Sequence, residues 1–71
     1  MHNYHNKRLT LLSNDIPKYV ADYFYCCYNE LKSLQYAPKY VGGDFWCNNN
    51  KKKFTEEEVR AVCDVKGNVH V

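Results

Sequence analysis

The most regular hydrophobic pattern in the chain lies between Ile16 and Tyr36. At about 100° per residue, the apolar side chains share one broad arc of a helical wheel and most polar ones lie opposite. Residues 13–15 offer capping oxygens just before Pro17, and Pro38 stops a helix near Tyr36. The pattern predicts one long amphipathic helix. Its apolar positions are Ile16, Tyr19, Val20, Tyr23, Phe24, Cys26, Cys27, Leu31 and Leu34.

Short apolar runs on both sides of this segment predict strands. Residues 7–12 are interpreted as a strand, with a first helical turn as the alternative. Residues 40–41 and 44–47 flank Gly42-Gly43, which suits the tight turn of a hairpin. The polar run 48–53 is expected to form an exposed loop, and residues 69–71 alternate as in a short last strand.

A second, short helix is expected from Thr55 to Cys63. Thr55 followed by Glu58 fits a capping box, and the three consecutive glutamates 56–58 favour the positive end of the helix dipole. Val59, Val62 and Cys63 then form its apolar stripe. We identify no internal repeat in the sequence.

These elements together predict an α+β fold in a single small domain, residues 1–71. One long amphipathic helix would pack on a small antiparallel sheet, and the short second helix would accompany it. A chain of 71 residues is too small for a TIM barrel, a dinucleotide-binding unit with its cofactor, or a kinase. Most enzyme classes are thereby excluded.

The composition predicts a folded protein in the cytoplasm. Ten basic and eight acidic residues leave a net charge of +2, which gives no strong field for nucleic acid. No apolar stretch is long enough for a signal peptide or a membrane span, so we expect no membrane partner. The richness in Lys, Asn and Tyr suggests AT-rich codons, and hence an AT-rich bacterium or its phage as the hypothetical source.

The four cysteines are expected to be reduced, buried thiols. They lack the closely spaced pairs of a structural zinc site, although Cys47, Cys63 and His70 would meet if the last strand folded back beside the hairpin. None stands beside a motif that would activate a nucleophile. We therefore predict no metal, no cofactor and no catalytic residue, so the protein is not expected to be an enzyme.

A nucleic-acid-binding accessory protein is the alternative function. The basic loop Lys51, Lys52 and Lys53 follows the aromatic pair Phe45-Trp46, and Lys7 and Arg8 would add phosphate contacts. Residues 55–65 resemble the first helix and turn of a helix-turn-helix. However, Gly67 and the valines that follow oppose a recognition helix.

The excess of tyrosine is the most informative feature of the composition. Seven tyrosines are more than the core of the predicted long helix needs. Tyr25, Tyr28 and Tyr36 fall on or beside its polar face, and Trp46 lies in the predicted hairpin. Exposed tyrosine is typical of protein interfaces. We expect these four residues to bind another protein, so that the chain is a small accessory module, with a phage or mobile element as its hypothetical source, that modulates a host protein. The competing interpretations are a helix buried on two sides and a homodimer.

Overall fold

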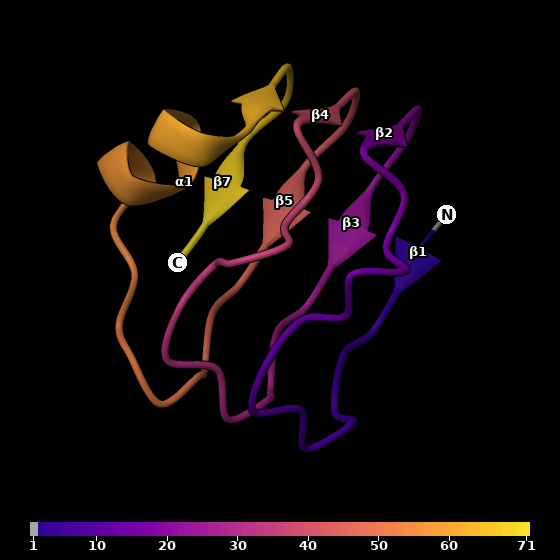
Figure 1. The fold of residues 1–71 in the computed structure, drawn as a ribbon. Helices are drawn as coiled ribbons and strands as arrows, with labels where there is room; N and C mark the ends of the chain where they lie inside the picture. Colours follow the sequence, from indigo (N-terminus) through magenta and orange to yellow (C-terminus); the bar gives the residue numbers. More distant parts are fainter. Residues whose placement is uncertain (1) are drawn as a thin grey trace.

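The strands of the chain pair with segments 21 to 24 residues away and not with their neighbours in sequence. The computed structural model describes residues 2–71, and over this range it contains seven two-residue strands and one helix (Figure 1). The elements are β1 (His2–Asn3), β2 (Tyr19–Val20), β3 (Phe24–Tyr25), β4 (Tyr40–Val41), β5 (Phe45–Trp46), α1 (Glu56–Val62), β6 (Asp64–Val65) and β7 (Val69–His70).

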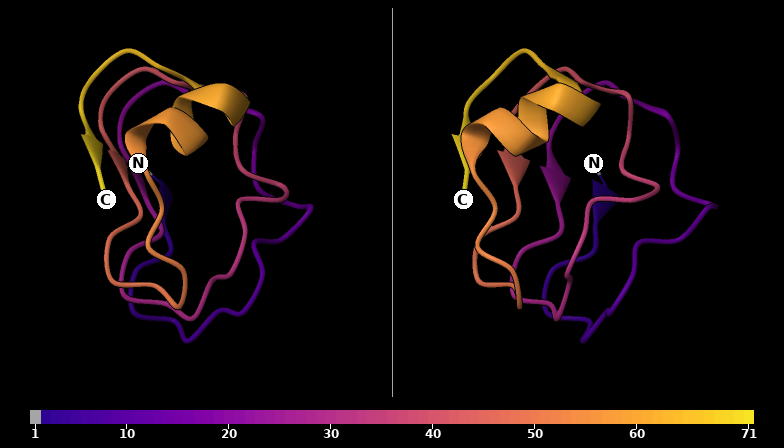
Figure 2. Two further views of the ribbon diagram at one scale, coloured as in Figure 1. Left: turned by 90° about the vertical axis from the view of Figure 1, so that its left-hand side faces the viewer. Right: turned by 60° about the vertical axis from the view of Figure 1, so that its left-hand side comes forward.

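Two parallel sheets form the frame of the molecule. One sheet has the order β1-β3-β5-β7 and the other has the order β2-β4-β6. The chain passes from one sheet to the other and back, so it winds through three stacked coils, residues 2–23, 24–44 and 45–68 (Figure 2). β7 then begins another turn. This architecture is a parallel β-solenoid, in which each coil contacts mainly its neighbours.

The core lies between the two sheets and is built from equivalent positions of successive coils. Phe24 and Phe45 pair in register and are fully buried, with their ring centroids 5.2 Å apart. Opposite them, Val20, Val41 and Val65 pair in register along the second sheet and are also buried. Successive residues of a strand point to opposite faces, so the second residue of each of these two-residue strands points outward.

Two asparagines, the buried Asn29 and the half-buried Asn50, join the coils where strands of the first sheet end. The Asn29 Oδ1 atom accepts hydrogen bonds from the backbone N–H groups of Lys7 and Leu9, both at 2.9 Å. Its Nδ2 atom donates to the carbonyl oxygens of Tyr4, Cys26 and Cys27. Asn29 therefore satisfies turn groups that no strand partner reaches.

Asn50 repeats this arrangement one coil later. Its Oδ1 atom accepts from the Leu31 N–H at 3.0 Å, and its Nδ2 atom donates to the carbonyls of Cys26 and Cys47. The polar loop 48–53 thus contributes a side chain that links coils, whereas the sequence predicted only an exposed loop.

Glycine is required where the corners of successive coils approach closely. A Cβ atom on Gly42 would lie 2.2 Å from the carbonyl oxygen of Ala21, and one on Gly67 would lie 2.7 Å from the backbone of Gly43. The Gly42-Gly43 pair therefore forms a corner between β4 and β5. It is not the turn of a hairpin, because those two strands belong to different sheets.

The short helix predicted from Thr55 to Cys63 is present as α1, which lies across the end of the stack of coils (Figure 2). Thr55 caps it: the Thr55 Oγ1 atom accepts from the Glu58 N–H, and the Glu58 side chain accepts from the Thr55 N–H. Val59 is the residue of α1 that is fully buried. Within residues 2–71 no helix has the length and apolarity to cross a bilayer.

The prediction of one long helix on an antiparallel sheet is wrong. The segment from Ile16 to Tyr36 contains β2, β3 and loops, and every pairing between strands is parallel. Tyr28 and Tyr36 have φ angles of 56° and 70°, which no α-helix contains. Residues 7–12 form no strand, whereas β7 does lie within the predicted strand 69–71.

The internal repeat that the sequence analysis missed explains this error. The tetrapeptide Pro-Lys-Tyr-Val occurs at residues 17–20 and again at 38–41. In such a repeat, each coil has two short strands, and each strand directs apolar side chains into the core. Over residues 16–36 the apolar residues of these two strands and of the loops fall at intervals that also fit one face of a helix.

We predict that Asn29→Ala lowers the free energy of unfolding by about 2–4 kcal/mol, because it leaves several buried backbone groups without partners. Urea unfolding followed by circular dichroism measures this loss. Asn14→Ala is the matched control: Asn14 is exposed, and its loss should change stability by less than about 0.5 kcal/mol. Equal effects of the two substitutions would contradict the role given to Asn29.

Candidate protein-binding face

The outer face of the four-stranded sheet carries a row of side chains at one repeated position. Asn3 pairs with Tyr25, Tyr25 with Trp46, and Trp46 with His70. The Tyr25 and Trp46 rings are stacked with centroids 5.8 Å apart, and the Trp46 and His70 rings are stacked at 3.6 Å. We call these four residues the outer row.

Asp44 fixes the His70 end of the outer row. Its Oδ1 atom accepts from the Asn68 N–H at 2.9 Å, and its Oδ2 atom lies 3.0 Å from His70 Nε2. The hydrogen bond from Asn68, followed by that from His70, lowers the pKa of the Asp44 carboxyl below its ordinary value of 3.8. Asp44 therefore stays ionised near neutral pH and holds the imidazole against Trp46.

A groove of about 430 Å³ borders the outer row on the side where Tyr28 and Asn48 lie. Tyr28 stands at its edge with 56% of its surface exposed. The Asn48 Oδ1 atom is buried and has no hydrogen-bond partner among residues 2–71. No lysine or arginine contributes to the groove, whose lining residues are Asn3, His5, Tyr25, Cys27, Tyr28, Trp46 and Asn48.

The structure brings together three of the four aromatic residues that the sequence analysis selected. Tyr25, Tyr28 and Trp46 all line the groove. Tyr36 lies in the loop before β4, where the Lys18 Nζ atom sits 5.9 Å from its ring centroid, and it is not part of the groove. The predicted reason for their exposure, a polar helix face, is replaced by the outer face of a sheet.

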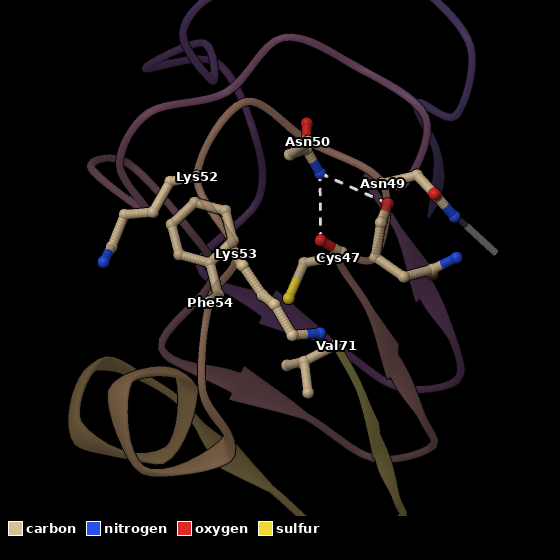
Figure 3. Close-up of a pocket in the computed structure, with 8 residues that line it drawn as sticks. Cys47, Asn49, Asn50, Lys52, Lys53, Phe54 and Val71 are labelled. Carbon is tan, nitrogen blue, oxygen red and sulfur yellow. Dashed lines mark hydrogen bonds between the residues drawn. The ribbon is translucent and has the colours of Figure 1, made fainter.

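The basic residues selected for nucleic acid do not line the groove, although Asn48 lines both the groove and a pocket that includes Lys52 and Lys53. Lys51, Lys52 and Lys53 are exposed in the loop of the third coil, beside a pocket of about 260 Å³ at the end of the stack (Figure 3). The Lys52 Nζ atom forms an ion pair with Glu58 Oε2 at 3.1 Å. Lys51 and Lys53 form no ion pair with any residue between 2 and 71.

Lys7 and Arg8 occupy the equivalent loop of the first coil. The backbone hydrogen bonds Glu30 N–H to Leu9 O and Lys52 N–H to Leu31 O show that these loops stack in order. The middle coil carries both an acidic and a basic side chain, Glu30 and Lys32, in the intervening loop, and both are exposed. Lys32 and Lys52 line the same pocket.

All four cysteines are buried free thiols. Burial raises the pKa of the Cys47 thiol to about 12 and that of Cys63 to about 11, and it raises the pKa of Cys26 well above its ordinary value. Thiols held neutral in this way are poor nucleophiles and metal ligands. Over residues 2–71 no three His, Cys, Asp or Glu side chains lie close enough to hold a metal ion.

Several residues of the face were not selected from the sequence. His70 was considered only as a metal ligand, and Asn3, Asp44 and Asn48 were not considered. The repeat contains the signal that identifies them: Asp44-Phe45-Trp46 and Asn68-Val69-His70 occupy matching positions in two coils. A search for periods of 20–50 residues would align these triplets and place their side chains in one row.

Comparison of the chain with protein-family models, with curated proteins and with solved structures gives no significant match in any of the three. The class of the fold, a parallel β-solenoid, therefore rests on its own topology. The function of its outer face has to be argued from geometry.

Asp44 gives the folded state a dependence on pH. A carboxyl whose pKa is lower in the folded state stabilises that state above its unfolded pKa, and this contribution disappears as pH falls through the folded pKa. We predict that Asp44→Asn is less stable than the unmodified protein above about pH 5, and that the difference shrinks as pH falls below 3.8. Urea midpoints measured between pH 7 and pH 2 test this, with the exposed Asp15→Asn as control. A difference that stays constant across this range would contradict the prediction.

Proposed function

We propose that this protein is a non-enzymatic binding module that docks another protein on the outer row and its groove. The observation that carries the proposal is the clustering of Tyr25, Tyr28 and Trp46 on one solvent-facing sheet surface. Tyrosine and tryptophan supply large, stiff contact areas with polar edges, which is why interfaces are rich in them.

The repeat architecture supports this assignment. The spacing Phe24-x-Cys26-x-x-Asn29-x-Leu31 resembles the coil of a leucine-rich repeat, in which the strands line one side of the solenoid. Solenoids present extended binding surfaces built from equivalent positions of successive repeats. The outer row has this form, since one position of each coil supplies one side chain.

We further propose that the protein acts in the cytoplasm, as an accessory protein of a phage or mobile element that modulates a host protein. The reduced cysteines support a reducing compartment. The abundance of Asn, Lys and Tyr supports an AT-rich genome. A coding sequence of balanced base composition would remove the second argument.

Nucleic-acid binding through Lys7, Arg8 and residues 51–53 is the competing function. The groove of the aromatic face contains none of those cations. The two functions differ in salt dependence, because phosphate contacts weaken steeply with salt. Retention of nucleic acid that falls steeply between 50 and about 200 mM salt, and that is lost in a Lys51→Ala/Lys53→Ala variant, would favour the competitor.

Tyr28 and Tyr36 form a matched pair for testing the binding face. Both are exposed, and both have positive φ angles, so alanine imposes a similar backbone change at each site. We predict that Tyr28→Ala weakens capture of the cellular partner at least about tenfold, the loss expected of an interface hot spot, whereas Tyr36→Ala leaves it unchanged. Pull-down with the two variants side by side, quantified by mass spectrometry, measures the difference. Loss of the partner with Tyr36→Ala alone would place the interface elsewhere.

A further inference from the structure

The groove beside the outer row carries no formal charge of its own. Asp44 stands at the end of the row but does not line the groove, and among residues 2–71 no Asp, Glu, Lys or Arg side chain contributes to the lining. A charged group that entered the groove would lose hydration there without gaining a counter-charge. The groove therefore matches an uncharged segment of a partner.

Three aromatic side chains offer hydrogen-bond donors to this groove. The Tyr25 and Tyr28 O–H groups and the Trp46 Nε1–H group have no hydrogen-bond partner within residues 2–71. Tyr28 is more than half exposed, and Tyr25 and Trp46 are half-buried. The lining thus presents ring surface for apolar contact together with donors that a partner can use.

The amide oxygens of the lining are less available than these donors. The Asn3 Oδ1 atom accepts from the His5 N–H at 3.1 Å and also contacts the ring nitrogen Nδ1 of His5. The Asn48 Oδ1 atom is buried. A partner segment that offers carbonyl oxygens and few N–H groups therefore fits this lining better than one that also needs acceptors.

Cys27 leaves space in the middle of the groove. The register of the sheet places Cys27 between His5 and Asn48, because each of these residues lies two positions after a member of the outer row. Its side chain is the smallest in the lining and is 6% exposed. Tyr25 and Tyr28 line the groove beside it. A small side chain among larger ones provides room for a ring of the partner.

We infer that the groove binds a proline-rich segment of the partner in the polyproline II conformation. Such a segment is uncharged, has no N–H at its prolines, leaves its carbonyl oxygens free to accept, and docks in aromatic-lined grooves. The lining spans three coils, or about 10 Å at a strand spacing of about 4.8 Å. One three-residue turn of polyproline II rises about 9 Å. This inference rests on the proposed function and specifies the chemistry of its partner.

Four synthetic heptapeptides test the inference: acetyl-Pro-Pro-Pro-Pro-Pro-Pro-Pro-amide, the same peptide with lysine or with glutamate at its central position, and acetyl-Ala-Ser-Ala-Ser-Ala-Ser-Ala-amide. Trp46 is the only tryptophan in the chain, so its fluorescence reports on the groove, and amide chemical shifts locate each peptide. We expect the all-proline peptide to bind at least about tenfold more tightly than the alanine-serine peptide, because it is already ordered and brings no N–H groups. A central charge of either sign should weaken binding.

Tyr28→Phe tests the hydrogen bond separately from the ring. It removes one O–H group and should weaken the all-proline peptide by about threefold, as expected for one hydrogen bond. Tyr36→Phe is the matched control, since Tyr36 is also exposed and has a positive φ angle but lies outside the groove. It should leave the affinity unchanged.

Cys27→Leu tests the space in the middle of the groove. The same position carries the larger side chains of His5 and Asn48 in the neighbouring coils, so the fold accommodates a larger residue there. The substitution should weaken the all-proline peptide at least about tenfold, because the added carbon atoms occupy the space that a proline ring needs. Circular dichroism checks that the variant is folded, and Tyr28→Phe decides the matter if it is not.

Equal binding of the alanine-serine peptide, tighter binding of either charged peptide, or no binding of any peptide would overturn the inference. Chemical-shift changes centred on residues 51–53 would do the same. A change in Trp46 fluorescence with protein concentration, in the absence of peptide, would show that a second copy fills the groove and would also overturn it.

The proposed function keeps its own test. A partner captured by the unmodified protein and lost with Tyr28→Ala would still use this face, even if the all-proline peptide failed to bind. Failure of that capture test, with the all-proline peptide bound as expected, would instead separate the groove from the cellular function.

Discussion

Hydrogen bonding between coils is the constraint on which this structure depends. Each strand has only two residues and no hairpin partner, so a single coil cannot satisfy its own backbone. The coils satisfy one another through parallel pairing, and Asn29 and Asn50 complete the bonding where the strands end. The buried phenylalanines and valines add apolar contact, but they meet only because the backbone register brings equivalent residues together.

The same register creates the candidate binding face. A position that points outward in one coil points outward in the next. Side chains at equivalent positions of successive coils therefore form a row on the surface. Tyr25, Trp46 and His70 stack for this reason, and Asp44 locks the last of them in place. Asp44 precedes β5, whereas Lys51, Lys52 and Lys53 follow it, and Asn48 lines both the groove and the pocket beside Lys52 and Lys53.

The two ends of the stack are not equivalent. β1 and β7 are the edges of the four-stranded sheet, and exposed edges invite further pairing. Asn29 and Asn50 each enter the loop of the preceding coil, but Lys7 stands at their position in the first coil.

The sequence by itself determined the features that depend on near neighbours. Thr55 and Glu58 are three residues apart, so their capping box could be predicted directly from the sequence. It also supplied three residues of the candidate face, although it assigned Tyr25 and Tyr28 to a helix and Trp46 to a hairpin, and the structure contains neither. Only the tertiary structure decided that residues 16–36 form strands and loops, because the two competing structures use almost the same local apolar pattern. The deciding bonds join residues 21 to 26 positions apart, and the meeting of Asp44, Trp46 and His70 follows from those bonds alone.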